Sequence, residues 1–193
     1  HSLLGVIPVG LFLVFHLSLN FTSVGGEEFY NNAIGVMELV PHSVLLAMEW
    51  LIIYIPMMFH AFYGIYIAFT ATHNTNRFGT YRNWAFKIQR FTGVFLVIFI
   101  AWHIFQTRVQ KALGETVEWS MVEQIVDNPF MLAFYIVGIL SATFHLSNGI
   151  WAFLVSWGIT QSPKSQKIAT IITSIFFALL SIVGVVAIVM FAV

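Results

Sequence analysis

The segment FYIVGILSATFHLSNGIWAF, residues 134–153, contains no Asp, Glu, Lys or Arg. A helix of twenty residues, rising 1.5 Å per residue, is about 30 Å long, which matches the hydrocarbon core of a bilayer. One imidazole, that of His145, lies in the middle of this apolar run. An ionisable side chain at membrane depth is costly and by default indicates a functional site. The segment therefore predicts a membrane-spanning helix that carries a functional histidine.

The whole chain has the composition of a membrane protein. Of its 193 residues, 59% are hydrophobic and 8% are charged, against about 25% charged in ordinary soluble domains. Five apolar segments reach the roughly 20 residues that a spanning helix needs, and they are too long and too evenly apolar for barrel strands. We therefore expect an all-α integral membrane protein, a single domain over residues 1–193 with five transmembrane helices. The expected helices cover residues 2–22, 44–70, 88–108, 130–157 and 168–193.

The sequence also excludes several kinds of site. It contains no cysteine, which removes disulfides, iron–sulfur ligation, thiolate zinc sites and covalent haem attachment. It has no nucleotide-binding glycine loop and no soluble catalytic motif, so we expect no dehydrogenase active site in this chain and no nucleic-acid partner. The chain begins at His1 rather than at a methionine, and we expect some N-terminal residues to be missing.

The charged residues predict the orientation. Basic residues gather in the second-to-third and fourth-to-fifth connections, and acidic residues gather on the other side, where Arg108 and Lys111 are the only basic ones. Because cytoplasmic loops carry an excess of Lys and Arg, we expect a cytoplasmic N-terminus and an external C-terminus. The first group is Arg77, Arg82, Lys87, Arg90, Lys164 and Lys167; the second is Glu27, Glu28, Glu38, Glu115, Glu118, Glu123 and Asp127.

Four of the seven histidines lie inside apolar runs, one in each of the first four expected helices. A single buried histidine could simply hydrogen-bond to a neighbouring helix. Four of them, one per helix, indicate bis-histidine haem ligation, in which a neutral nitrogen approaches iron from each side. Zinc is less favoured because no H-E-x-x-H motif or carboxylate accompanies them. The expected ligands are His16, His60, His103 and His145, whereas His1, His42 and His73 lie at segment ends or in loops and are expected to have no haem role.

Two internal repeats accompany these histidines. His60 and His145 share the pattern H-x-x-x-G-I, which places Gly64 and Gly149 one turn after the imidazole on the same helix face. A glycine there has no Cβ, so a porphyrin could lie flat against the helix. A weaker echo links the Gly-Val pairs at residues 5–6 and 93–94, which precede the other two histidines.

Depth in the membrane suggests how the histidines pair. His103 is five residues from Arg108 on the outer side, roughly 8 Å along a helix. His145 is eighteen residues from Asp127, roughly 27 Å, and must lie nearer the cytoplasm. The expected pairs are His16 with His103 at an outer haem and His60 with His145 at an inner haem.

Other ionisable residues near the ends of the expected spans are further candidates for a function. Glu49 is the only acidic residue within an expected span, near the outer end of the second helix. It could be a proton relay or an interfacial carboxylate satisfied by water. His42 and Glu38 could line the entrance to the same site as Glu49, or they could belong to a solvated loop. Lys87 and Arg90 could neutralise haem propionates or only mark the inner interface.

Five stretches together resemble one known family. They are HSLLGVIPVGLFLVFH, FHAFYGIYIAFTA, YRNWAFKIQRFTGV, FIAWHIFQTR and residues 134–153. They resemble the cytochrome b558 subunits of succinate dehydrogenases from Bacillus-type bacteria, over essentially the whole chain. The resemblance implies a five-helix anchor in the bacterial cell membrane with two haems b and menaquinone. It also implies docking of a flavoprotein and an iron–sulfur subunit on the cytoplasmic side, and its haem ligands fall on His16, His60, His103 and His145.

The resemblance implies the electron-transfer subunit of a succinate:menaquinone oxidoreductase. Electrons from the iron–sulfur partner would pass the inner haem, then the outer haem, and reduce menaquinone near the outer interface. Glu49 is then the candidate proton relay of the quinone site. The same anchor could serve fumarate reduction, and the sequence does not fix the direction. A di-haem anchor of another quinone-linked dehydrogenase, such as formate dehydrogenase or hydrogenase, is an alternative. A non-redox transporter or structural anchor is another.

Overall fold

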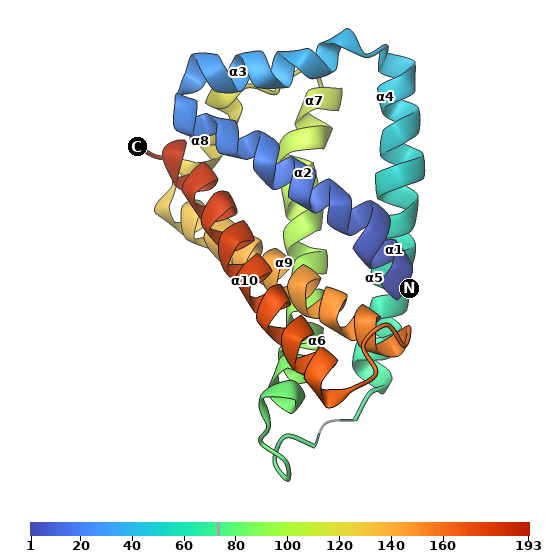
Figure 1. Cartoon of the computed structure of the whole chain (residues 1–193). Helices are drawn as coiled ribbons and strands as arrows, with labels where there is room; N and C mark the ends of the chain where they lie inside the picture. The colour runs from blue at the N-terminus through green and yellow to red at the C-terminus, as the bar shows by residue number, and fades with distance from the viewer. Residues whose placement is uncertain (73) are drawn as a thin grey trace.

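The computed structural model describes residues 1–72 and 74–193, and these form helices joined by loops, without strands (Figure 1). Five helical spans are long and apolar enough to cross a membrane, which confirms the expected all-α membrane fold. Span one is Ser2–Gly25, span two His42–Thr70, span three Tyr81–Ala112, span four Pro129–Ser156 and span five Pro163–Met190. His73 lies outside the described residues.

Spans four and five are the single helices α9 (Pro129–Ser156) and α10 (Pro163–Met190), whereas the other three contain changes of helix type. Span one consists of α1 (Ser2–Leu4), η1 (Gly5–Val9), α2 (Gly10–Asn20) and η2 (Phe21–Gly25). Span two consists of α4 (His42–Met48), η4 (Glu49–Tyr54) and α5 (Ile55–Thr70). Span three consists of α6 (Tyr81–Ile104), η5 (Phe105–Val109) and α7 (Gln110–Ala112).

Two spans begin earlier than the hydropathy pattern predicts. Span three begins at Tyr81 rather than at residue 88, and the Thr80 side chain caps its first turn. Span five begins at Pro163 rather than at residue 168, behind a capping box formed by Ser162 and Ser165. Capping side chains and an N-terminal proline start a helix without contributing hydropathy. The expected starts were therefore wrong, because polar first turns of a helix extend beyond the apolar core.

Short helices that the sequence analysis did not predict cover the end of the bundle that carries the acidic residues. They are α3 (Glu27–Gly35), η3 (Val36–Leu39) and α8 (Trp119–Val126), and α3 crosses the upper end in Figure 1. The rings of Tyr30 and Trp119 lie 4.8 and 4.5 Å from that of Phe191, at the end of span five. Burial raises the pKa of Tyr30 to about 12, so its hydroxyl stays protonated and donates to the Asn20 side chain.

Small and hydroxylated residues let spans one, four and five pack closely. A Cβ added to Gly184 would lie 2.6 Å from Ile139 and 3.3 Å from Leu17, so the backbone of α10 approaches both neighbours there. The Thr143 and Ser181 hydroxyls hydrogen-bond at 2.8 Å within the same interface. Such contacts replace the hydrophobic effect as the cause of helix association in lipid. Figure 1 shows α9 and α10 side by side along their length.

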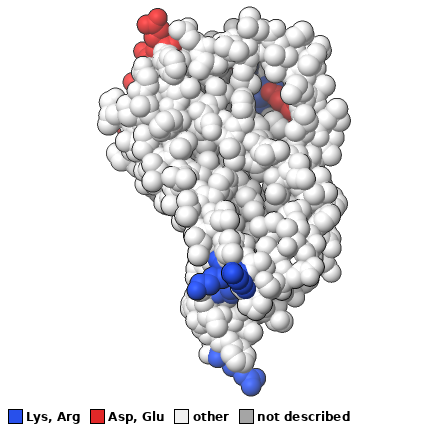
Figure 2. Space-filling view, in the orientation of Figure 1, with Lys and Arg blue, Asp and Glu red and all other residues white. Residues whose placement is uncertain are grey.

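The outward surface is apolar, and its charges are separated between the two ends. Phe62, Phe91 and Ile172 are each at least 60% exposed on the outside of the bundle, as expected for a surface in contact with lipid. In Figure 2 basic atoms lie at the lower end and acidic atoms at the upper end, with an almost uncharged band between them. The chain is therefore a multi-pass membrane protein.

Candidate haem-binding site

The four histidines of the apolar runs meet in two pairs. The ring centroids of His16 and His103 are 5.8 Å apart, and those of His60 and His145 are 6.0 Å apart. Metal–imidazole distances are about 2 Å, so two imidazoles on opposite sides of one metal ion have centroids roughly 6 Å apart. The structure thus brings together the residues that the sequence pairs, at a spacing that fits one haem iron in each pair. Among the described residues no cluster of three or more metal-ligating side chains competes with them.

The inner pair, His60 and His145, is held in the tautomer that ligation requires. Their Nδ1 atoms face the backbone carbonyls of His1 and Gln89, each at 3.2 Å. A carbonyl oxygen only accepts, so Nδ1 carries the proton and Nε2 keeps its lone pair. A histidine that binds a metal ion commonly donates its second ring N–H in this way. The Thr92 hydroxyl also lies 3.3 Å from Nδ1 of His145, and it can accept there because it donates its proton to the Ile88 carbonyl at 2.9 Å. These contacts favour binding of both inner imidazoles through Nε2.

Two glycines let spans one and three pass close to the inner pair. A Cβ added to Gly5 would lie 2.6 Å from Nδ1 of His60, and one added to Gly93 would lie 3.0 Å from Cε1 of His145. The same spans carry the outer histidines eleven and ten residues later, a rise of roughly 15 Å. The weaker Gly-Val repeat therefore lies where each of these helices passes the inner pair. Further along, the same helices supply His16 and His103 to the outer pair.

The glycines of the stronger repeat have different neighbours. A Cβ added to Gly64 would lie 3.1 Å from the His1 ring, and one added to Gly149 would lie 3.5 Å from the Gln89 side chain. The expectation that these glycines make room for a porphyrin stays a prediction. His1 itself stacks on His60 with centroids 4.2 Å apart. The sequence analysis gave His1 no role, but its ring and carbonyl both contact the inner pair.

Each of the three π-helical segments lies beside the site. A π turn widens the helix by one residue and often occurs at functional positions. The segment η1 contains Gly5 next to the inner pair, η4 begins at Glu49, and η5 directly follows the turn of His103. Pro8 lies within η1, and Pro56 lies two residues after η4. The π turns thus coincide with Gly5, Glu49 and the turn after His103, and with the prolines of spans one and two.

Glu49 is held by an ion pair across spans two and three. The Nε and Nη2 atoms of Arg108 each lie 3.0 Å from Oε2 of Glu49, and both side chains are about 30% exposed or less. This is the only salt bridge between acidic and basic side chains in the described part of the chain. Figure 2 shows basic and acidic atoms together in a recess near the upper end. Glu49 therefore has Arg108 as a protein partner, and the choice between a proton relay and an interfacial carboxylate stays a prediction.

A polar network connects the inner pair to the basic end of the bundle. Arg82 donates to Thr170 at 2.7 Å and to Asn148 at 3.4 Å. Asn148 in turn donates to the Gln89 side-chain oxygen at 3.0 Å, and the Gln89 amide donates to the His145 carbonyl at 2.9 Å. The network fixes the helix that carries His145 relative to span three and to the start of span five.

Arg90 has an unsatisfied donor beside this network. Its Nε is buried and has no hydrogen-bond partner within the described residues, while its Nη1 donates to the Phe86 carbonyl at 3.1 Å. A buried N–H without an acceptor is costly. The donor therefore suits an anionic group from outside the chain, such as a haem propionate. Lys87 instead lies over the Trp84 ring at 5.1 Å, as is common at an interface.

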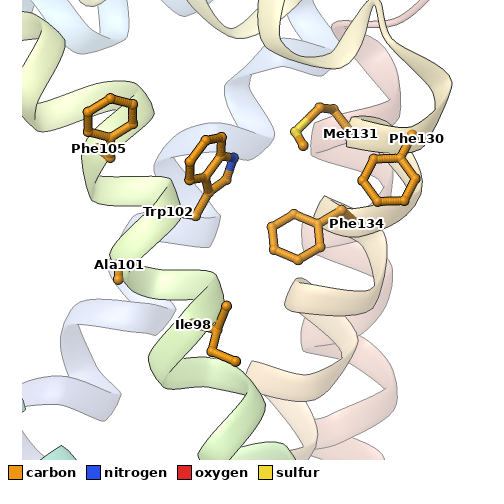
Figure 3. A pocket seen from close by; sticks show the side chains of 7 residues that line it. All are labelled: Ile98, Ala101, Trp102, Phe105, Phe130, Met131 and Phe134. Carbon is orange, nitrogen blue, oxygen red and sulfur yellow. The ribbon is translucent and has the colours of Figure 1, made fainter.

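An apolar groove lies between spans three and four, in the half of the bundle nearer the acidic end (Figure 3). It has a volume of about 560 Å³ and opens sideways toward the lipid. Its lining contains no charged residue. Behind the lining, the side-chain amide of Gln106 donates to the sulfur of Met131 at 3.8 Å. It is lined by Ile98, Ala101, Trp102, Phe105, Phe130, Met131 and Phe134. The groove suits an apolar ring or chain rather than an ion.

The chain is similar to known proteins of one family. Residues 72–185 match the family described as "Succinate dehydrogenase/Fumarate reductase transmembrane subunit". The chain is 48% identical, over 188 residues, to the succinate dehydrogenase cytochrome b558 subunit of Bacillus subtilis (strain 168). This similarity covers 97% of the chain and 92% of that relative. No solved structure matches the chain.

Proposed function

This chain belongs to the family of succinate dehydrogenase/fumarate reductase transmembrane subunits, and we propose that it anchors a succinate:menaquinone oxidoreductase in the bacterial cell membrane with two haems b bound. Bound haems would supply one-electron carriers within the bilayer. The observation that carries the proposal is the presence of two imidazole pairs at two depths, with centroid separations of 5.8 and 6.0 Å.

The residues of the chain would bind, orient and neutralise these groups. His16 and His103 would ligate the outer iron, and His60 and His145 the inner iron. Backbone carbonyls hold the inner rings with Nε2 free. The unsatisfied Nε of Arg90 would accommodate a propionate, because the donor otherwise has no acceptor among the described residues.

The partners would divide between the two ends. A flavoprotein and an iron–sulfur subunit would dock on the basic end, which the positive-inside rule makes cytoplasmic, so the N-terminus would be inside and the C-terminus outside. Menaquinone would react near the outer pair, where Glu49 and Arg108 meet and where the apolar groove opens. Glu49 would relay protons there, and quinol protons would be drawn from the external side.

Purification of the chain with its native partners tests the proposed function. We expect two haems b per chain, both reduced by succinate, and co-purification of a flavoprotein and an iron–sulfur protein. The measurements are a reduced-minus-oxidised optical spectrum, a haem-to-protein ratio and identification of the subunits. A preparation without haem would leave a non-redox anchor or transporter. Haem with formate dehydrogenase or hydrogenase subunits would identify a different anchor.

The docking face can be tested by cross-linking, because the chain has no native cysteine. Lys164 and Glu115 are exposed at the basic and acidic ends, respectively, and form a matched pair for single-cysteine variants. We expect Lys164→Cys to cross-link to the iron–sulfur subunit in the intact complex and Glu115→Cys to give no such product. Cross-linking through Glu115→Cys alone would reverse the proposed orientation.

A further inference from the structure

His103 differs from the inner histidines in the group that its Nδ1 faces. Nδ1 of each inner ring has a backbone carbonyl as a partner, and Nδ1 of His145 has the Thr92 hydroxyl at 3.3 Å as well. Nδ1 of His103 instead lies 3.3 Å from the hydroxyl of Tyr135. Tyr135 is only 5% exposed and comes from span four. A tyrosine hydroxyl can either donate or accept a hydrogen bond. The contact alone therefore leaves the tautomer of His103 open.

The neighbours of Tyr135 settle the direction of this hydrogen bond. The Tyr135 hydroxyl lies 3.1 Å from Oε1 of Gln106, and Nε2 of Gln106 lies 3.8 Å from the Met131 sulfur. A thioether sulfur accepts but cannot donate, so the Gln106 NH₂ group faces Met131 and its oxygen faces Tyr135. An amide oxygen only accepts, so Tyr135 donates its proton to Gln106. Its oxygen is then left to accept from Nδ1–H of His103.

We propose that Tyr135 is a positioning residue for His103, which it holds, through a one-way chain of hydrogen bonds anchored on Met131, in the tautomer with Nε2 free for the outer haem iron. The inference rests on the proposed haem binding by the His16–His103 pair. Figure 3 shows Met131 pointing into the groove, so the far end of this chain lies at the groove wall. In the inner pair, Nδ1 of each ring faces a backbone carbonyl, and Nδ1 of His145 additionally lies 3.3 Å from the Thr92 hydroxyl, so neither ring depends on a side-chain acceptor alone.

Tyr135→Phe keeps the packing of the ring and removes the hydroxyl, which is the acceptor for Nδ1–H of His103. A hydrogen bond from Nδ1–H makes the ligand more basic and so stabilises ferric iron. Without it, we expect the ratio of reduced to oxidised outer haem, at the wild-type midpoint potential, to rise about tenfold, equivalent to about 59 mV for a one-electron couple. The inner haem should keep its potential. The measurement is an optical redox titration of the whole complex, with the ferric EPR signal reporting the axial imidazole orientation.

Tyr66→Phe is the matched control. Tyr66 is 62% exposed on span two, and loss of its hydroxyl should shift neither haem. Gln106→Leu is the second variant, because it removes the acceptor that directs the Tyr135 proton. The hydroxyl can then donate to Nδ1 of His103 and favour the tautomer with Nε2 protonated. We expect this variant to retain less outer haem than Tyr135→Phe does.

The double variant Tyr135→Phe/Gln106→Leu makes the test specific. Without the Tyr135 hydroxyl, no proton can be donated to Nδ1 of His103. The double variant should therefore retain as much outer haem as Tyr135→Phe alone. Additive losses, a shift of both haems, or an unchanged outer potential in Tyr135→Phe would overturn the inference. If Tyr135→Phe does not assemble, Met131→Leu should still shift the outer haem alone, and its failure to do so would also overturn it. Absence of the outer haem from the unaltered complex would instead refute the proposed function.

Discussion

Replacing His145 with alanine is expected to reduce the haem content from two per chain to one, and replacing His60 is expected to remove the same haem. The two rings lie 6.0 Å apart and would ligate one iron, so loss of either leaves a single axial ligand in a buried site. The outer pair is roughly 15 Å away along spans one and three and should keep its haem. Haem extraction and redox titration of the purified complexes measure the number and the identity of the haems that remain.

The reciprocal variants and a control complete this test. His16→Ala and His103→Ala should both remove the other haem, because these rings form the 5.8 Å pair. His42→Ala should retain both haems, since His42 lies exposed at the start of span two. The same result is predicted for His73, which lies outside the described residues. Loss of different haems from the His60 and His145 variants would refute the pairing.

Replacing Glu49 with glutamine is expected to lower succinate:menaquinone turnover by about tenfold or more, while both haems remain bound and reducible by succinate. Glutamine has the shape of glutamate and still accepts a hydrogen bond from Arg108, but it has no titratable proton. The ion pair should therefore be replaced by a neutral hydrogen bond at the same place. Turnover and haem content are measured in the same preparation, so that a fall in rate is not confused with loss of cofactor.

Two further variants distinguish a role of Glu49 in proton relay from a structural role in holding spans two and three together. Glu49→Asp keeps a carboxylate on a shorter side chain and should recover part of the turnover. Arg108→Gln breaks the same ion pair but keeps the carboxylate, so its turnover should exceed that of Glu49→Gln. Equal losses in Glu49→Gln and Arg108→Gln would assign the pair a structural role. Unchanged turnover in Glu49→Gln would move the quinone reaction away from this carboxylate, with the groove of Figure 3 as the remaining candidate.

The number of spans and the histidines inside them followed from the sequence. Both depend on local properties, since hydropathy summed over about 20 residues decides whether a helix crosses the bilayer. Depth could be predicted in the same way, because the rise per residue of a helix is fixed. These two quantities predicted the pairs His16 with His103 and His60 with His145, and the structure places the rings of these pairs 5.8 and 6.0 Å apart. Haem ligation by the two pairs stays a prediction.

The sequence could not predict which side chains meet at a given depth. Depth is set along the helix axis, but contact also depends on the rotation and tilt of each helix, which packing against its neighbours determines. The π turns of η1, η4 and η5 change that rotation locally. Only the tertiary structure therefore joined Glu49 to Arg108, set Gly5 and Gly93 against the inner pair, and placed Tyr135 on His103.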